Sequence, residues 1–134
     1  MNRYVAERKW KNFGYNISDY FYEKTKGLFV TPPPKIIIPK HFSDRVLDRF
    51  LVTEHHIIET MFYHLINYNL CEFLYWYKSK QYKTLDIVIS RFRVTLDRSS
   101  KNNIIARTIW NNDIVQSSSN DKTIMTIVLK TQNK

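Results

Sequence analysis

The stretch 83–96, KTLDIVISRFRVTL, marks the point at which the hydrophobic pattern of the chain changes its period. Its apolar residues alternate first on odd and then on even positions: Leu85, Ile87, Ile89, Phe92, Val94 and Leu96. Alternation with a period of two predicts β-structure, because successive side chains of a strand point to opposite faces. A change of parity within one strand requires a bulge or a bend, which we place near Ser90 and Arg91.

Upstream of this stretch the apolar residues recur at helical spacing. Ser43 is a suitable N-cap, and Asp44 would sit in the first turn, where the helix dipole favours an acid. A broad apolar stripe follows: Val46, Leu47, Phe50, Leu51, Ile57, Ile58, Met61, Phe62, Leu65 and Ile66. We therefore predict a long helix over about residues 43–78, with Thr53 before Glu54 as an alternative cap that would divide it into two helices.

The segment before this helix has three parts. Residues 1–17 mix basic and aromatic side chains without clean periodicity, so we predict an arm that is flexible when free. A short helix over about 18–26 would begin at Ser18 as N-cap and stop at Gly27. Residues 31–39 form a proline-rich connector, in which the β-branched run 36–38 is interpreted as a short edge strand or a buried extended segment.

Two further strands are predicted after the parity change. Residues 97–103 are polar and form a turn, 104–110 a second strand, 111–122 a polar loop and 124–129 a third strand. The expected fold is therefore α+β, a single domain over residues 1–134. Its helical N-terminal half, with 18–82 mainly helical, would pack on a C-terminal antiparallel sheet of three strands within 83–131.

Composition places the chain among globular intracellular proteins. Its residues are 43% hydrophobic and 25% charged, which is ordinary for a folded domain. A single cysteine, Cys71, cannot form an internal disulfide, and residues 1–10 contain no apolar core of a signal peptide. No apolar run is long enough to span a membrane. We expect an intracellular protein that is not secreted and has no membrane span.

The formal net charge of +9 is the strongest indication of function. A positive potential of this size attracts polyanions and accelerates their association. Lysine is also favoured by AT-rich coding, but eight arginines accompany the lysines here: Arg3, Arg8, Arg45, Arg49, Arg91, Arg93, Arg98 and Arg107. Arginine is suited to phosphate contacts and to stacking. The alternative interpretations are a solvated basic surface that maintains solubility and, less strongly indicated, binding to an anionic membrane surface.

Catalytic and metal-binding motifs are weak. His55 and Glu59 would share one helix face, with His56, His64 and Cys71 on the same helix, but zinc sites require three or four converging ligands. We expect His55 to be solvated and Cys71 to be buried as a small hydrophobic residue. Only two glycines occur in the chain, so no phosphate-cradling loop is indicated. We therefore expect a non-enzymatic protein without cofactor or metal.

Basic and aromatic residues interleave in three places: the N-terminal arm, the end of the long helix and the strands. Cations can hold phosphates there while aromatic rings stack on bases, although Tyr75, Trp76 and Tyr77 would equally close the end of the core. Alternation places Arg91 and Arg93 on the sheet face away from the core, where Arg107 would join them. The predicted nucleic-acid-binding residues are Arg8, Lys9, Trp10, Lys11, Lys78, Lys80, Lys83, Arg91, Arg93 and Arg107.

Two functions remain open at this stage. The first is a small basic nucleic-acid-binding protein, for RNA or DNA, with phosphate-dominated contacts and weak sequence specificity. The second is a structural or accessory subunit of a larger protein assembly, bound through its aromatic and apolar surface and the proline segment. Salt dependence separates the two, because only the first involves the release of many counterions.

Overall fold

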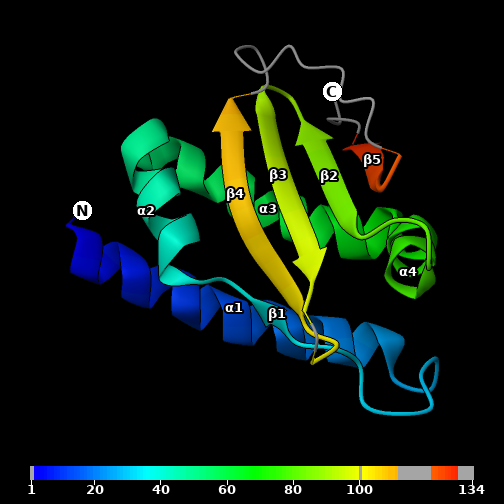
Figure 1. Cartoon of the computed structure of the whole chain (residues 1–134). Helices are drawn as coiled ribbons and strands as arrows, with labels where there is room; N and C mark the ends of the chain where they lie inside the picture. The colour runs from blue at the N-terminus through cyan, green and yellow to red at the C-terminus, as the bar shows by residue number, and fades with distance from the viewer. Residues whose placement is uncertain (1, 100, 112–121, 130–134) are drawn as a thin grey trace.

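A computed structural model describes residues 2–99, 101–111 and 122–129. Helices and strands follow one another from the N-terminus (Figure 1). The elements are α1 (Arg3–Thr25), β1 (Ile36–Ile37), α2 (Lys40–Arg49), the 3-10 turn η1 (Val52–Glu54), α3 (His55–Tyr68), α4 (Leu70–Lys78), β2 (Thr84–Ile89), β3 (Phe92–Arg98), β4 (Ile104–Asn111) and β5 (Ile124–Leu129). The predicted α+β class is confirmed.

The sheet differs from the prediction in strand number and direction. Five strands pair in the order β1-β4-β3-β2-β5. The β2–β3–β4 meander is antiparallel, as predicted, but β5 runs parallel to β2 and β1 runs parallel to β4. The prediction of three antiparallel strands was wrong because β5 returns to the far side of β2. The edge strand expected within 36–38 is confirmed as β1.

The bulge or bend predicted near Ser90 and Arg91 is a hairpin turn at these two residues, which divides the stretch 83–96 into two strands. Ile89 pairs with Phe92, so Ser90 and Arg91 alone form the turn between β2 and β3. Ser90 takes the left-handed conformation that such tight hairpins favour, with φ 50°. Across a two-residue turn, odd-numbered residues of β2 pair with even-numbered residues of β3, so both sets lie on the same face of the sheet. This pairing accounts for the change of parity in the sequence.

Helix α1 includes most of the segment predicted as a flexible arm. The side chain of Asn2 caps it by accepting a hydrogen bond from the Val5 N–H at 2.9 Å. Its buried residues recur every three or four positions: Ala6, Trp10, Phe13, Gly14, Ile17, Phe21 and Thr25. The arm prediction was wrong, because this stripe contains Ala6 and Gly14 and is therefore less visible than a run of large apolar residues. The helix ends near the predicted stop, and Gly27 has φ +89°.

Close contact between α1 and β1 explains two residues in the middle of the helix. A Cβ on Gly14 would lie 3.4 Å from the Ile36 carbonyl oxygen and 3.5 Å from the Ile38 nitrogen. The Ser18 hydroxyl, predicted as an N-cap, instead accepts from the Ile36 N–H at 2.8 Å and donates to the Ile36 carbonyl at 3.1 Å. Ser18 thus satisfies the free edge of β1.

The predicted long helix over 43–78 is helical over most of its length, but it is divided into three helices. Helix α2 begins at Lys40, before the predicted cap Ser43, and ends where Phe50 adopts an extended conformation. After η1, α3 begins at His55, and it separates from α4 at Asn69, whose φ of −128° and ψ of 28° interrupt the helix. The divisions occur where β-branched residues and asparagine weaken helix propensity.

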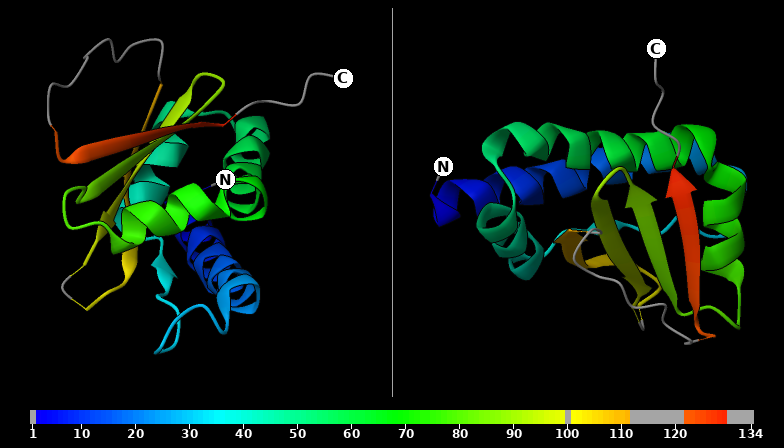
Figure 2. Two further views of the ribbon diagram at one scale, coloured as in Figure 1. Left: turned by 90° about the vertical axis from the view of Figure 1, so that its right-hand side faces the viewer. Right: turned by 90° about the horizontal axis from the view of Figure 1, so that it is seen from above.

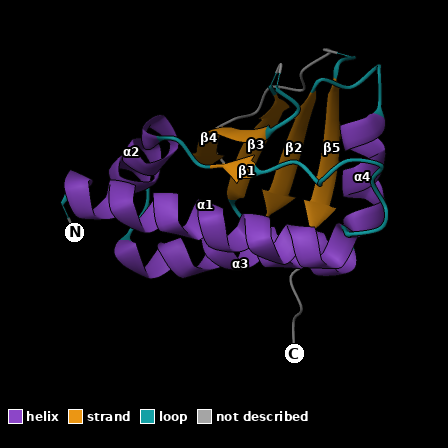
Figure 3. Cartoon of the chain, turned by 90° about the horizontal axis from the view of Figure 1, so that it is seen from below, coloured by secondary structure: helices purple, strands orange, loops and turns teal. Residues whose placement is uncertain are grey.

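The helices lie on one side of the sheet, and no helix of the described residues covers the opposite face of the β2–β3–β4 meander (Figure 2). Helix α1 runs beside α3 (Figure 3), and Phe13 contacts Phe62 with ring centroids 5.6 Å apart. One hydrophobic cluster joins residues of the helices to the inward faces of the strands. We call the helix-free side the outer face.

Candidate functional site

Four connecting segments meet at one end of the sheet. The strand pairings place the starts of β2, β4 and β5 beside the end of β3. Two backbone hydrogen bonds hold the segments together: the Ile104 N–H donates to the Lys35 carbonyl, and the Lys83 N–H donates to the Thr123 carbonyl, each at 2.9 Å. Residues before β1, between α4 and β2, after β3 and before β5 therefore share this end.

Exposed lysines from these segments form a group that we call the lysine end: Lys35, Lys78, Lys80, Lys83, Lys101 and Lys122. Within residues 2–99, 101–111 and 122–129, none of their ammonium groups forms an ion pair. The nearby carboxylate of Asp97 is bound by Thr84 at 2.6 Å and by Arg107 at 3.0 Å. The positive charge of the lysine end is thus available to an external anion.

Arg98 holds the loop that follows Lys78 at the end of α4 and carries Lys80 and Lys83. Its guanidinium donates to the carbonyls of Tyr77, at 2.9 Å, and of Ser79 and Tyr82. These are carbonyls at and just beyond the end of α4, which have no partner within the helix. The guanidinium carbon also lies 5.8 Å from the centroid of the Trp76 ring. One half-buried cation therefore fixes the path of residues 79–82 between Lys78 and Lys83.

Aromatic side chains accompany the lysines. Tyr75 is 62% exposed, and it borders a shallow hollow with Lys78 and Lys80. Tyr77 lies in a second hollow of about 470 Å³, together with Lys35 and Lys101. The Tyr77 hydroxyl donates to the Asn102 carbonyl at 2.7 Å, and burial raises the pKa of this phenol above its ordinary value. The lysine end thus combines exposed lysines with one fixed ring, Tyr77, and one exposed ring, Tyr75.

The predicted binding residues do not form one surface. Lys78, Lys80 and Lys83 come together at the lysine end. The other cations lie elsewhere, and several are bound to carboxylates: Lys9 to Glu59 at 2.9 Å, Arg91 to Glu54, Arg93 to Asp86 at 3.1 Å and Arg107 to Asp97 at 3.0 Å. Arg91 lies in the β2–β3 turn rather than on the outer face with Arg93. Arg8 and Lys11 are exposed on α1.

Trp10 cannot serve as the stacking ring that the sequence suggested. Its indole is 0% exposed and lies edge-on to Phe13 and Phe42, with ring centroids 5.5 and 5.9 Å away. A base needs access to a ring face, so the prediction of Trp10 as a binding residue is corrected to a core residue.

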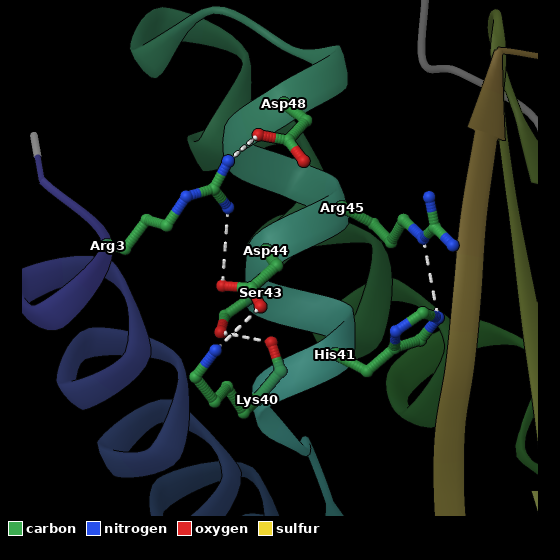
Figure 4. A network of polar contacts seen from close by, with 7 residues as sticks. All are labelled: Arg3, Lys40, His41, Ser43, Asp44, Arg45 and Asp48. Atoms are coloured by element: carbon green, nitrogen blue, oxygen red, sulfur yellow. Dashed lines mark hydrogen bonds and ion pairs between the residues drawn. The ribbon is translucent and has the colours of Figure 1, made fainter.

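A network of ion pairs neutralises the cations between α1 and α2 (Figure 4). Arg3 is bound to Asp44 and Asp48, and Lys40 is bound to Asp44 at 2.9 Å. The hydrogen bond from Lys40 holds the pKa of the Asp44 carboxyl below its ordinary value. This end of the molecule is basic in sequence, yet much of its charge is already compensated.

Histidine and cysteine differ from their predicted environments. His55 is buried, its ring nitrogens lack a well-formed hydrogen bond to any described residue, and its ring centroid lies 5.9 Å from that of Trp10. Cys71 is exposed. His55 therefore lies on the buried face of α3 and Cys71 on the exposed face of α4, the reverse of what we expected. The described part of the chain contains no group of three His, Cys, Asp or Glu side chains able to hold a metal ion.

The buried His55 makes stability depend on pH. Burial, and secondarily the Lys9 ammonium, lower the pKa of His55 below its ordinary value. The unfolded chain then binds more protons between that lowered pKa and about 6.5. The contribution is complete above about pH 6.5 and is lost as the pH falls towards the folded pKa, by at most about 1.4 kcal/mol per pH unit.

Urea unfolding at a series of pH values tests this expectation. His55→Phe should remove this part of the acid destabilisation, whereas replacing the exposed neighbour, His56→Gln, should leave it in place. Parallel stability curves for the wild type and His55→Phe would contradict the assignment.

Comparisons with protein-family models, curated proteins and solved structures give no match. Functional interpretation therefore depends on the geometry alone. None of the helices in the described ranges combines the length and apolarity that crossing a membrane requires.

Proposed function

We propose that the protein binds nucleic acid without catalysis, through phosphate contacts made at the lysine end. The observation that carries the proposal is the convergence of lysines from separate segments at one end of the sheet, unpaired among the described residues. Carboxylates elsewhere neutralise many of the remaining cations, so the free charge is unevenly distributed. An array of ammonium groups on flexible stems suits a chain of phosphates.

The contacts predicted from this arrangement are weakly specific. Lysine binds phosphate as a point charge and carries no base-reading geometry at these positions. Neutralising about 4–6 phosphates predicts a slope of log affinity against log salt of about −3 to −5. Association that is indifferent to salt would instead favour a subunit of a protein assembly bound through apolar surface.

Matched double variants test the location of the site. Lys80→Gln with Lys83→Gln removes two charges from the lysine end, and Arg8→Gln with Lys11→Gln removes two from α1. We expect the first to lower affinity for oligonucleotides about tenfold per lost contact at about 50 mM salt and to make the salt slope shallower by about 1.4–1.8. The second should change both quantities much less.

Fluorescence anisotropy with labelled oligonucleotides measures both variants. Equal losses would assign the effect to net charge and remove the lysine end as the site. A larger loss in the α1 variant would move the site to Arg8 and Lys11. No measurable affinity of the wild type at low salt would refute the proposed function.

A further inference from the structure

Among the described residues, the outer face carries one aromatic side chain, beside polar residues and the valines Val88 and Val128. Strand alternation directs these side chains away from the helices: Asp86, Arg93, Thr95, Thr108, Trp110 and Thr126. Trp110 is 39% exposed, whereas Trp10 and Trp76 are each 0% exposed. A large indole on a threonine-rich sheet face contributes little to the core and requires a separate explanation.

A β-bulge turns Trp110 outwards. Thr95 pairs with Thr108 and Leu96 pairs with Ala106, so Arg107 is the extra residue on β4. Ala106 and Ile109 can then both face the core, although they are three positions apart. Simple alternation along 104–110 would have grouped Ala106 and Trp110 on one face. The bulge is thus the feature that presents Trp110 on the outer face.

The Trp110 ring is held in place by the guanidinium of Arg49. The Arg49 guanidinium carbon lies 4.3 Å from the ring centroid. Arg49 is itself fixed, because it donates to the Ile109 carbonyl at 2.7 Å. On the other side, Trp110 pairs across the sheet with Arg93, which binds Asp86 at 3.1 Å. Arg49 thus fixes the indole while 39% of the residue stays exposed, and an exposed ring face is what stacking on a base requires.

Carboxylates on the outer face are compensated, so they do not repel a polyanion. Asp86 is bound by Arg93 and by Thr95 at 2.8 Å, and Asp97 is bound by Arg107 and Thr84. The face leads directly to the lysine end, where β4 begins. From Ile104 to Trp110, a strand rise of about 3.3 Å per residue gives a separation of about 20 Å.

We propose that the outer face binds single-stranded nucleic acid, with one base stacked on Trp110 while the lysine end holds phosphates of the same strand. The inference rests on the proposed function and narrows its ligand. A single strand can offer an unpaired base face to Trp110, whereas a duplex keeps its bases stacked inside. The separation along β4 requires a strand of several nucleotides to reach both sites.

Intrinsic tryptophan fluorescence tests the inference, because Trp110 is the exposed tryptophan and the other two are buried. We expect single-stranded oligonucleotides of about 12 nucleotides to quench the emission and the corresponding duplex to leave it nearly unchanged. Trp110→Leu should lose the quenching and bind the single strand about 5–150-fold more weakly, with an unchanged salt slope. Trp110→Phe, which keeps an aromatic face, should retain most of the affinity.

Tyr15→Leu is the matched control, since Tyr15 is 60% exposed on α1, away from the outer face. Its affinity should equal that of the wild type. Wild-type affinity of Trp110→Leu, or equal loss in the Leu and Phe variants, would overturn the stacking role. Duplex binding as tight as single-strand binding, without quenching, would overturn the choice of ligand. In both cases, a loss of oligonucleotide affinity in the double variant Lys80→Gln with Lys83→Gln would still support the proposed function.

Discussion

Replacing Trp10 with alanine is expected to lower the free energy of unfolding by about 3–5 kcal/mol. The indole is fully buried among Phe13, Phe42 and His55, and its removal leaves a cavity between α1, α2 and α3. Alanine is the best helix former, so backbone propensity does not contribute to the loss. The expected effect is a large part of the stability of an ordinary domain.

Urea unfolding of Trp10→Ala beside Tyr15→Ala measures the effect. Both variants remove an aromatic ring from α1, but Tyr15 is 60% exposed and its replacement should change stability by less than about 0.5 kcal/mol. Similar small losses in both variants would return residues 1–17 to the status of a flexible arm, as the sequence suggested. Binding of oligonucleotides by folded Trp10→Ala should be unaffected, because the ring touches no exposed surface.

The sequence predicted that most of residues 43–78 is helical. It did not predict where this segment divides into α2, α3 and α4. The apolar stripe that begins at Val46 indicated helix over most of 43–78, which is correct. The breaks at Phe50 and Asn69 depend on how each helix packs, and tertiary packing routinely overrides local propensity. Residues 18–25 of α1 lie within the helix predicted over about 18–26, but residues 3–17 were missed for a related reason: their buried stripe includes Ala6 and Gly14, and Gly14 is small where β1 approaches closely.

The strand order of the sheet could not be predicted from local sequence patterns. The parity change between Ile89 and Phe92 was visible, but a bulge and a tight turn both produce it. The pairing of β5 with β2 joins segments about forty residues apart, with the register Thr84↔Ile124, and no turn signal specifies it. The same applies to β1 beside β4. Sheet order is set by the burial of whole faces, which is a property of the folded chain.

The candidate site was also predictable only in part, because the strand order decides which residues meet there. Lys78, Lys80 and Lys83 are neighbours in sequence, and their interleaving with Tyr75 and Tyr77 indicated a binding surface. Lys35, Lys101 and Lys122 were missed because each stands alone at a strand boundary, and only the strand order brings them together. Trp110 was missed because the bulge at Arg107 reverses its parity.

Arg98→Met is expected to lower the free energy of unfolding by about 2–4 kcal/mol and to weaken nucleic-acid binding beyond the effect of one lost charge. The substitution keeps an apolar stem against Trp76 but leaves the carbonyls of Tyr77, Ser79 and Tyr82 without their donor. Hydrogen bonds to charged groups are worth about 1.5–3 kcal/mol each, and water will replace some of them. Amide exchange of Tyr82, whose N–H donates to the Ser79 hydroxyl at 3.1 Å, should accelerate.

Lys83→Met is the matched comparison. It removes one positive charge from the same end of the sheet but no side-chain hydrogen bond to a backbone carbonyl. It should leave stability nearly unchanged and lower affinity by one phosphate contact, about tenfold at about 50 mM salt. A larger affinity loss in Arg98→Met would mean that fixing residues 79–82 contributes to binding, because the guanidinium is already bound to three backbone carbonyls. Equal losses of affinity in the two variants, with full stability in both, would instead make Arg98 one more external cation. Ordered loops hold their ligands at a smaller entropic cost, so the order that Arg98 imposes on the loop is expected to matter for a site made of flexible lysines.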